Sequence, residues 1–157
     1  MNLSKHFTLK EMIASATAAS KGVANIPNNE EIENIKKTCS QMEIVRQLLG
    51  GNTIQVLSCF RSEVVNKLVG GSKTSAHRYG LAVDFRCPSY GNTRQIAEAL
   101  VKAQKQGLIQ FDQLILEFPE NGLASWVHIG WSKGKPRGQT LTATKQGGET
   151  VYLQGLV

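Results

Sequence analysis

The sequence predicts an α+β fold with a mostly antiparallel sheet. Two observations support this prediction: helical periodicity dominates the first half of the chain, and most of the strand-like alternation follows in the second half. Hydrophobic residues make up 41% and charged residues 19%, a balance that excludes a disordered or fibrous protein. Because 157 residues fit one domain and no linker or repeat interrupts them, we expect a single domain over residues 1–157.

Helices are predicted at four places. Thr8 and Glu11 form a capping-box pattern, which predicts a short helix from about residue 8. A longer helix is expected over residues 29–49, where apolar side chains recur every three or four positions. These side chains are Ile32, Ile35, Cys39, Met42, Val45 and Leu49. Shorter helices should cover residues 62–69 and 92–106, and glycines follow each of the last three helices.

Strands are expected over residues 53–58, 81–85, 113–118 and 126–131, followed by a small hairpin over 139–153. In three of these strands one polar side chain faces away from apolar neighbours. These residues are Asp84, Glu117 and His128. If their strands are neighbours, the three side chains converge on one side of the sheet. The same alternation predicts that Phe118 lies on the opposite face from Glu117.

The net charge indicates the kind of partner to expect, and the cysteine spacing excludes one kind of metal site. The net charge of +6 favours an anionic partner, such as nucleic acid, acidic lipid or a cell-wall polymer. The three cysteines are widely spaced and form no CxxC pair, so a disulfide framework and a zinc–thiolate site are not expected. The N-terminal segment lacks the apolar core of a secretory signal, and no segment is apolar enough for membrane insertion.

Only three histidines are available for imidazole chemistry: His6, His77 and His128. His77 lies in a predicted loop just before the strand that holds Asp84, and His128 lies in a later strand. Two imidazoles and one carboxylate form the usual ligand set of a catalytic zinc site. The alternative interpretation is a hydrogen-bonded core histidine and a turn aspartate. His6 lies in an N-terminal segment that we expect to be flexible and exposed.

The segment from Ser58 to Asp84 carries the pattern S-x-x-R-S, then N, G-G-S and S-x-H-x(6)-D. This pattern resembles the zinc D-Ala-D-Ala carboxypeptidase family of peptidoglycan peptidases, which includes phage endolysins and shares the fold of the hedgehog signalling domain. Residues 112–118 and 126–128 are similar to a subgroup common in phage genomes. The resemblance implies a hedgehog/DD-peptidase-like fold, with helices packed on one side of the sheet.

The resemblance also implies roles for individual residues. His77, Asp84 and His128 would hold one Zn²⁺ per chain. Arg61 matches the family arginine that binds a substrate carboxylate or the developing oxyanion, a role that suits a planar and permanently charged guanidinium. Ser75 would orient the loop or the substrate. The expected mechanism is attack of a zinc-bound hydroxide on a peptide carbonyl.

The sequence departs from the family at the general base. Better-known members place a glutamate three residues before the second histidine, where this chain has Ser125. We expect Glu117 to replace it as the catalytic base, because it lies on the preceding strand with the right facing. The alternative is that Glu117 pairs with a lysine or supports a ligand histidine. Trp126 could line a groove for a peptide or a sugar, whereas Trp131 is expected to pack in the core.

The expected function is therefore that of a zinc-dependent peptidoglycan peptidase of phage origin, either a D-Ala-D-Ala carboxypeptidase or a stem-peptide endopeptidase. We expect a monomer whose partner is the bacterial stem peptide, with no specific nucleic acid. The protein would be made in the host cytoplasm without a signal peptide. It would act at the periplasm or cell wall, or be carried in the virion.

Two alternatives stay open at this point. Ser125 in place of glutamate gives some support to a catalytically silent virion or wall-binding protein on the same fold. A basic nucleic-acid-binding protein is less favoured, because the cations are dispersed and no recognition motif is present. Residues 70–74 superficially suggest a phosphate-binding loop, but Ser72 and Lys67 occupy the positions where that motif needs glycine.

Overall fold

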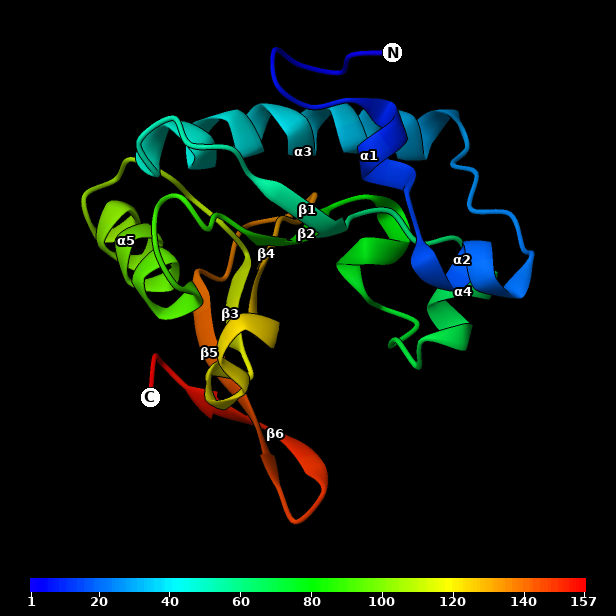
Figure 1. The fold of residues 1–157 in the computed structure, drawn as a ribbon. Helices are drawn as coiled ribbons and strands as arrows, with labels where there is room; N and C mark the ends of the chain where they lie inside the picture. Colours follow the sequence, from blue (N-terminus) through cyan, green and yellow to red (C-terminus); the bar gives the residue numbers. More distant parts are fainter.

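The computed structural model describes residues 1–157 and contains one six-stranded sheet in the order β1-β2-β4-β3-β5-β6 (Figure 1). The strands are β1 (Gln55–Ser58), β2 (Ala82–Arg86), β3 (Gln113–Glu117), β4 (Trp126–Gly130), β5 (Gln139–Gln146) and β6 (Glu149–Gln154). All neighbouring strands are antiparallel except β3 and β5, which run parallel. The predicted α+β fold with a mostly antiparallel sheet is confirmed.

The helices agree with the predicted positions, with short additions. They are α1 (Leu9–Ile13), α2 (Ala16–Lys21), α3 (Asn29–Leu48), α4 (Glu63–Leu68) and α5 (Thr93–Lys105), with 3₁₀ helices η1 (Ala76–Tyr79) and η2 (Pro119–Ala124). Thr8 caps α1 as predicted, because its hydroxyl accepts from the Glu11 backbone N–H. Capping boxes at Asn28 and Asn92 begin the two long helices. None of the helices combines the length and the apolar composition needed to span a bilayer.

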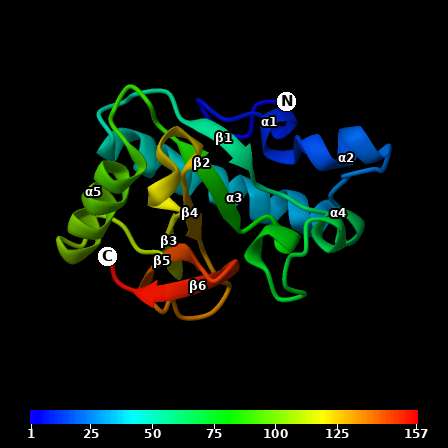
Figure 2. The same cartoon turned by 60° about the horizontal axis from the view of Figure 1, so that its bottom comes forward.

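The main core lies between one face of the sheet and the two long helices. Fully buried side chains from β2, β3 and β4 meet the apolar faces of α3 and α5 in a single cluster. The sheet contributes Val83, Phe85, Leu114, Leu116, Val127 and Ile129 to this cluster. Figure 1 shows α3 running along β1 and β2, and Figure 2 shows the β5–β6 hairpin at the edge of the molecule away from α3. The opposite sheet face carries Asp84, Glu117 and His128 together with a small apolar cluster of Ile115, Leu141 and Ala143.

Helix α3 also fixes the turn that leads into β2. The side-chain amide of Asn34 donates to the carbonyl of Tyr79 at 3.0 Å, and the hydroxyl of Thr38 donates to the carbonyl of Gly80 at 2.7 Å. Gly80 ends η1 with a φ of 74°, in the left-handed region that glycine adopts without steric cost. Both donors are buried polar residues in the middle of an otherwise apolar helix face.

Three local predictions need correction. His77 lies in η1 rather than in a loop, because Ser75 caps this short 3₁₀ helix. Phe118 was predicted on the core face, but β3 ends at Glu117 and a φ of 54° turns the Phe118 ring onto the other face of the sheet. His6 is exposed as expected, yet Glu43 on α3 tethers its ring and its backbone N–H.

Replacing Gly80 by alanine should destabilise the protein more than the same change at Gly107. Both glycines have a φ of +74°, so each variant should lose about 1–2 kcal/mol to left-handed strain. A Cβ at Gly80 would also lie 2.6 Å from Cγ1 of Ile35, whereas a Cβ at Gly107 would meet nothing within 4 Å. The overpacking predicts a further loss of about 1–3 kcal/mol in the free energy of unfolding, measured in urea. Equal losses would contradict this packing argument.

Candidate metal centre

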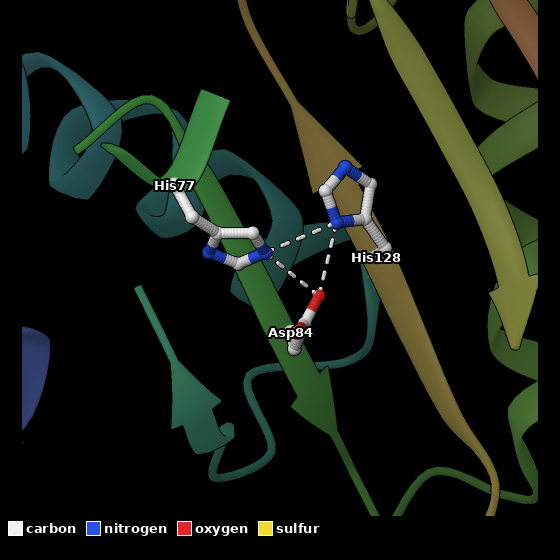
Figure 3. Close-up of side chains that lie close together, drawn as sticks. All are labelled: His77, Asp84 and His128. Atoms are coloured by element: carbon white, nitrogen blue, oxygen red, sulfur yellow. Dashed lines mark hydrogen bonds and ion pairs between the residues drawn. The ribbon is translucent and has the colours of Figure 1, made fainter. Parts of the chain in front are cut away.

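Three side chains converge on the sheet face opposite the main core (Figure 3). Oδ1 of Asp84 lies 3.1 Å from Nε2 of His77 and 3.0 Å from Nδ1 of His128, and the two imidazole nitrogens are 3.2 Å apart. His77 is almost fully buried, and the Asp84 and His128 side chains are each 13% exposed. The structure thus brings together the three residues predicted as metal ligands.

The sheet register places two of these three residues. Asp84 on β2 lies directly opposite His128 on β4, so their side chains point to the same face. His77 comes from outside the sheet and is held at the end of β1. Its Nδ1 donates to the carbonyl of Cys59 at 2.7 Å, and its own carbonyl accepts from the Arg61 backbone N–H at 2.9 Å. Because Nδ1 is the donor, Nε2 presents a lone pair to the cluster.

The donor set and its spacing fit a divalent metal ion such as zinc. Ligand atoms about 2.0–2.1 Å from a tetrahedral zinc ion lie about 3.3 Å from each other. The three observed separations of 3.0–3.2 Å are close to this value. Two imidazoles and one carboxylate would leave one position of a tetrahedral ion for water or substrate, and all three side chains line an open pocket. The residues present can therefore hold a metal ion.

Burial and charge favour the protonation states that ligands need. Burial lowers the pKa of His77, and the nearby His128 and Arg61 act in the same direction against the opposing charge of Asp84. Burial alone would raise the pKa of Asp84, but the two imidazoles outweigh it and hold the pKa well below its ordinary range. A neutral imidazole at His77 and an ionised carboxylate at Asp84 are the forms that bind a metal.

Glu117 lies in the row of side chains next to the triad. Its partner across β4 is Trp126, two residues before His128, so Glu117 faces the same pocket. The residue is 8% exposed. Burial and the charge of Asp84 raise the pKa of Glu117 to about 7, against the opposing influence of His128 and Arg61. A carboxyl group with this pKa can both accept and release a proton near neutral pH.

Arg61 reaches the triad from the other side. Its Nη2 is 3.7 Å from Oδ2 of Asp84, and its Nη1 donates to Oδ1 of Asn66 at 3.3 Å. Asn66 in turn donates to the carbonyl of Ser72, which fixes the loop beside the guanidinium. A Cβ at Gly71 would lie 2.1 Å from Oδ1 of Asn66. The R…N…G-G-S pattern in the sequence therefore corresponds to one packed unit that positions Arg61.

The other predicted site residues divide between positioning and pocket lining. The Ser75 hydroxyl accepts from the His77 N–H at 3.3 Å, so it orients the turn that carries this residue. Trp126 is half-buried and lines the pocket. Ser125 is buried and bonds to Thr93 on α5 and to the backbone carbonyl of Glu117, both at 2.7 Å. The hydroxyl of Ser125 thus joins β3 to α5 instead of facing the triad.

The structure adds pocket residues that the sequence did not single out. Tyr152 on β6 lines the same pocket as the triad, as do Gln113 and Gln139. No motif identified Gln139 and Tyr152, because their position depends on the parallel pairing of β5 with β3. Gln113 lies on β3 itself, on the same face as Glu117. The aromatic side chain in an alternating hairpin was the only local signal for Tyr152.

This arrangement has the composition of a hydrolytic metal centre: a His–Asp–His donor set, a buried glutamate in the adjacent row and an arginine beside it. Comparison with known families gives the same class. A family model described as Peptidase M15 matches residues 5–118, and the chain belongs to this family of zinc-dependent metallopeptidases. The matched segment includes His77, Asp84 and Glu117 and ends ten residues before His128. No curated protein matches the chain.

Replacing His77 by alanine should abolish stoichiometric zinc binding. The wild-type chain should bind about one Zn²⁺, and the variant should bind it at least about 100-fold more weakly because one of three ligands is lost. Isothermal titration and elemental analysis would measure this. The His6→Ala variant is the control, since His6 lies outside the triad, and it should keep wild-type affinity. Equal zinc content in the two variants would contradict the assignment of His77 as a ligand.

The Glu117→Gln variant should change how stability depends on pH in metal-free protein. The folded-state pKa of Glu117 is about 7, above its ordinary value of 4.5, so wild-type stability falls as the pH rises from 4.5 through 7. The Glu117→Gln variant should not show this loss, because glutamine has no carboxyl group to ionise. It should be more stable than wild type by about 3 kcal/mol at pH 8 and gain nothing below pH 4.5. Urea unfolding between pH 4 and 9 would test this, with the exposed Glu98→Gln variant as the control.

Proposed function

We propose that the protein is a zinc-dependent peptidase that cleaves the stem peptide of bacterial peptidoglycan. The observation that carries this proposal is the convergence of His77, Asp84 and His128 beside the buried Glu117 and Arg61 in one open pocket. A zinc ion in such a site lowers the pKa of a bound water and polarises a carbonyl group. The remaining steps fall to residues of the chain itself.

Glu117 is the proposed general base. Its carboxylate would accept a proton from the attacking water and then deliver that proton to the nitrogen of the departing amine. In the metal-free chain, burial and the charge of Asp84 raise its pKa to about 7, which makes this carboxylate more basic than an ordinary one. The side chain makes no hydrogen bond to the rest of the chain, so its oxygens are available to water and substrate. Ser125, at the position where better-known members have glutamate, is already engaged by Thr93 and the Glu117 carbonyl.

Arg61 is the proposed electrostatic partner of the reaction. Its guanidinium is held beside Asp84 and would donate to the oxyanion that develops on the substrate, or to a substrate carboxylate. Asn66 and the adjacent glycine loop hold it in place before substrate arrives, which lowers the cost of orienting it during the reaction.

The cell wall as substrate is supported by charge as well as by family. The net charge of +6 would attract an anionic wall polymer. A nucleic-acid surface is less favoured, because Lys133 and Arg137 near the pocket are paired with Glu30 and Asp112. We further propose that the protein is a phage product made in the host cytoplasm, which acts on the wall as a monomer or is carried in the virion. A silent wall-binding role loses its main support, since Glu117 can supply the base.

Digestion of purified peptidoglycan tests this function directly. Zinc-loaded protein should release D-Ala or shortened stem peptides, identified by mass spectrometry. The Glu117→Gln variant should keep its zinc but lose about 10²–10⁴-fold in kcat, because general-base assistance is removed. Glu98→Gln, which alters an exposed carboxylate on α5, should retain wild-type rates. Folded, zinc-loaded wild-type protein that releases no fragment would refute the proposed function for this substrate.

A further inference from the structure

On the sheet face that carries the triad, the two rows of residues that flank the triad differ in chemical character. Asp84, His128, Ile115 and Leu141 form one row across β2, β4, β3 and β5. One flanking row, on the side of residues 131–138, contains the polar residues Gln113 and Gln139. The side-chain amide of Gln113 donates to the side-chain oxygen of Gln139. The row on the opposite side contains Trp126, Glu117, Ala143 and Tyr152. A substrate that crosses the triad would therefore meet unlike surroundings at its two ends.

Apolar side chains gather around Glu117 in a cluster separate from the main core. We call this cluster the aromatic shelf. It consists of Ile115, Phe118, Trp126, Leu141, Ala143 and Tyr152. The aliphatic members are buried, and the rings of Phe118 and Trp126 lie 5.5 Å apart. Lys145 lies over the Phe118 ring, 5.6 Å from its centroid. Trp126 and Tyr152 line the pocket and stay accessible to a ligand there.

Tyr152 forms the outer wall of this shelf. Ala143 is its partner on β5 and also the partner of Glu117, so only a methyl group separates the two longer side chains. Burial raises the pKa of Tyr152, and the charges of Glu117 and Asp84 raise it further, as expected for a phenol that faces the site. Yet 54% of the residue is exposed. A large, half-exposed ring beside a reactive centre gains contact area when a ligand covers it.

The hairpin that carries Tyr152 is held in place from its other face. The Thr142 hydroxyl donates to the Gly155 carbonyl at 2.8 Å and accepts from the Val157 N–H at 3.1 Å. Arg94 on α5 donates to the Val157 carbonyl at 2.8 Å. These bonds tie β5 to the chain that follows β6 and to a core helix. The shelf is therefore preformed, which lowers the entropic cost of binding.

The proposed proton transfer determines which part of the substrate lies over the aromatic shelf. In the proposed function, Glu117 delivers its proton to the departing amine, so the part of the substrate that carries this amine must lie over Glu117. We infer that the aromatic shelf binds the side chain of the residue that supplies the released amine, and that Tyr152 makes this subsite prefer an uncharged, apolar residue. This inference rests on the proposed function and adds the specificity of one side of the cleaved bond.

Synthetic stem peptides test the preference. The peptides keep the cleaved bond, as mapped by mass spectrometry, and vary only the residue that supplies the amine: Gly, Ala, Leu or Glu. Wild-type kcat/KM should be at least about 10-fold higher for Leu than for Gly or Glu. Tyr152→Ala should reduce this ratio below about 3-fold, mainly through KM. Tyr152→Phe, which retains the ring, should keep it, and so should Tyr90→Ala, which removes a tyrosine outside the pocket.

The outcomes separate the two proposals. An unchanged Leu/Gly ratio in Tyr152→Ala, or a wild-type preference for Glu, would overturn the shelf while leaving the peptidase intact. If wild-type protein cleaves no peptide, the proposed function fails. Binding of the same peptides to zinc-loaded Glu117→Gln protein, followed by calorimetry, then tests the shelf without turnover. The affinities should follow the same order, and equal affinities for the Leu and Gly peptides would refute the subsite.

Discussion

The hydrogen bond from Nδ1 of His77 to the carbonyl of Cys59 is the contact on which the whole site depends. Asp84 and His128 meet through the pairing of β2 with β4, and this pairing is also held by the core side chains of the two strands. His77 belongs to a four-residue 3₁₀ helix with no strand to align it. The bond fixes the ring through Nδ1, leaves Nε2 to face the triad, and ties the imidazole to the segment that leads from β1 to Arg61. The same contact therefore helps to position both the His77 imidazole and Arg61.

Much of the fold was predictable because local signals and tertiary packing agree. The spacing from Ile35 to Val45 identified α3, and strand alternation placed Asp84, Glu117 and His128 on one face. The pairing of β5 with β3 was not predictable, since parallel strands joined by a crossover leave no short-range signature. Tyr152 was missed for this reason.

Two other errors have local causes. Phe118 continues the alternation of β3 in the sequence, but its positive φ reverses the direction of its side chain, and non-glycine residues seldom adopt this conformation. The 3₁₀ helix around His77 is a single turn, too short to produce a periodic pattern. The role of Ser125 was likewise hidden, because its partners Thr93 and Glu117 are distant in sequence.

The triad joins parts of the chain that lie far apart, since His77 and His128 are separated by 51 residues. A metal ion held by both would act as a removable cross-link across that span. It can bind only after η1 has docked against the sheet, so binding energy becomes folding energy. The stability of the folded chain would then depend on the metal ion that the proposed reaction also needs. Removing the metal by chelation would therefore abolish activity and also make the chain more susceptible to proteolysis.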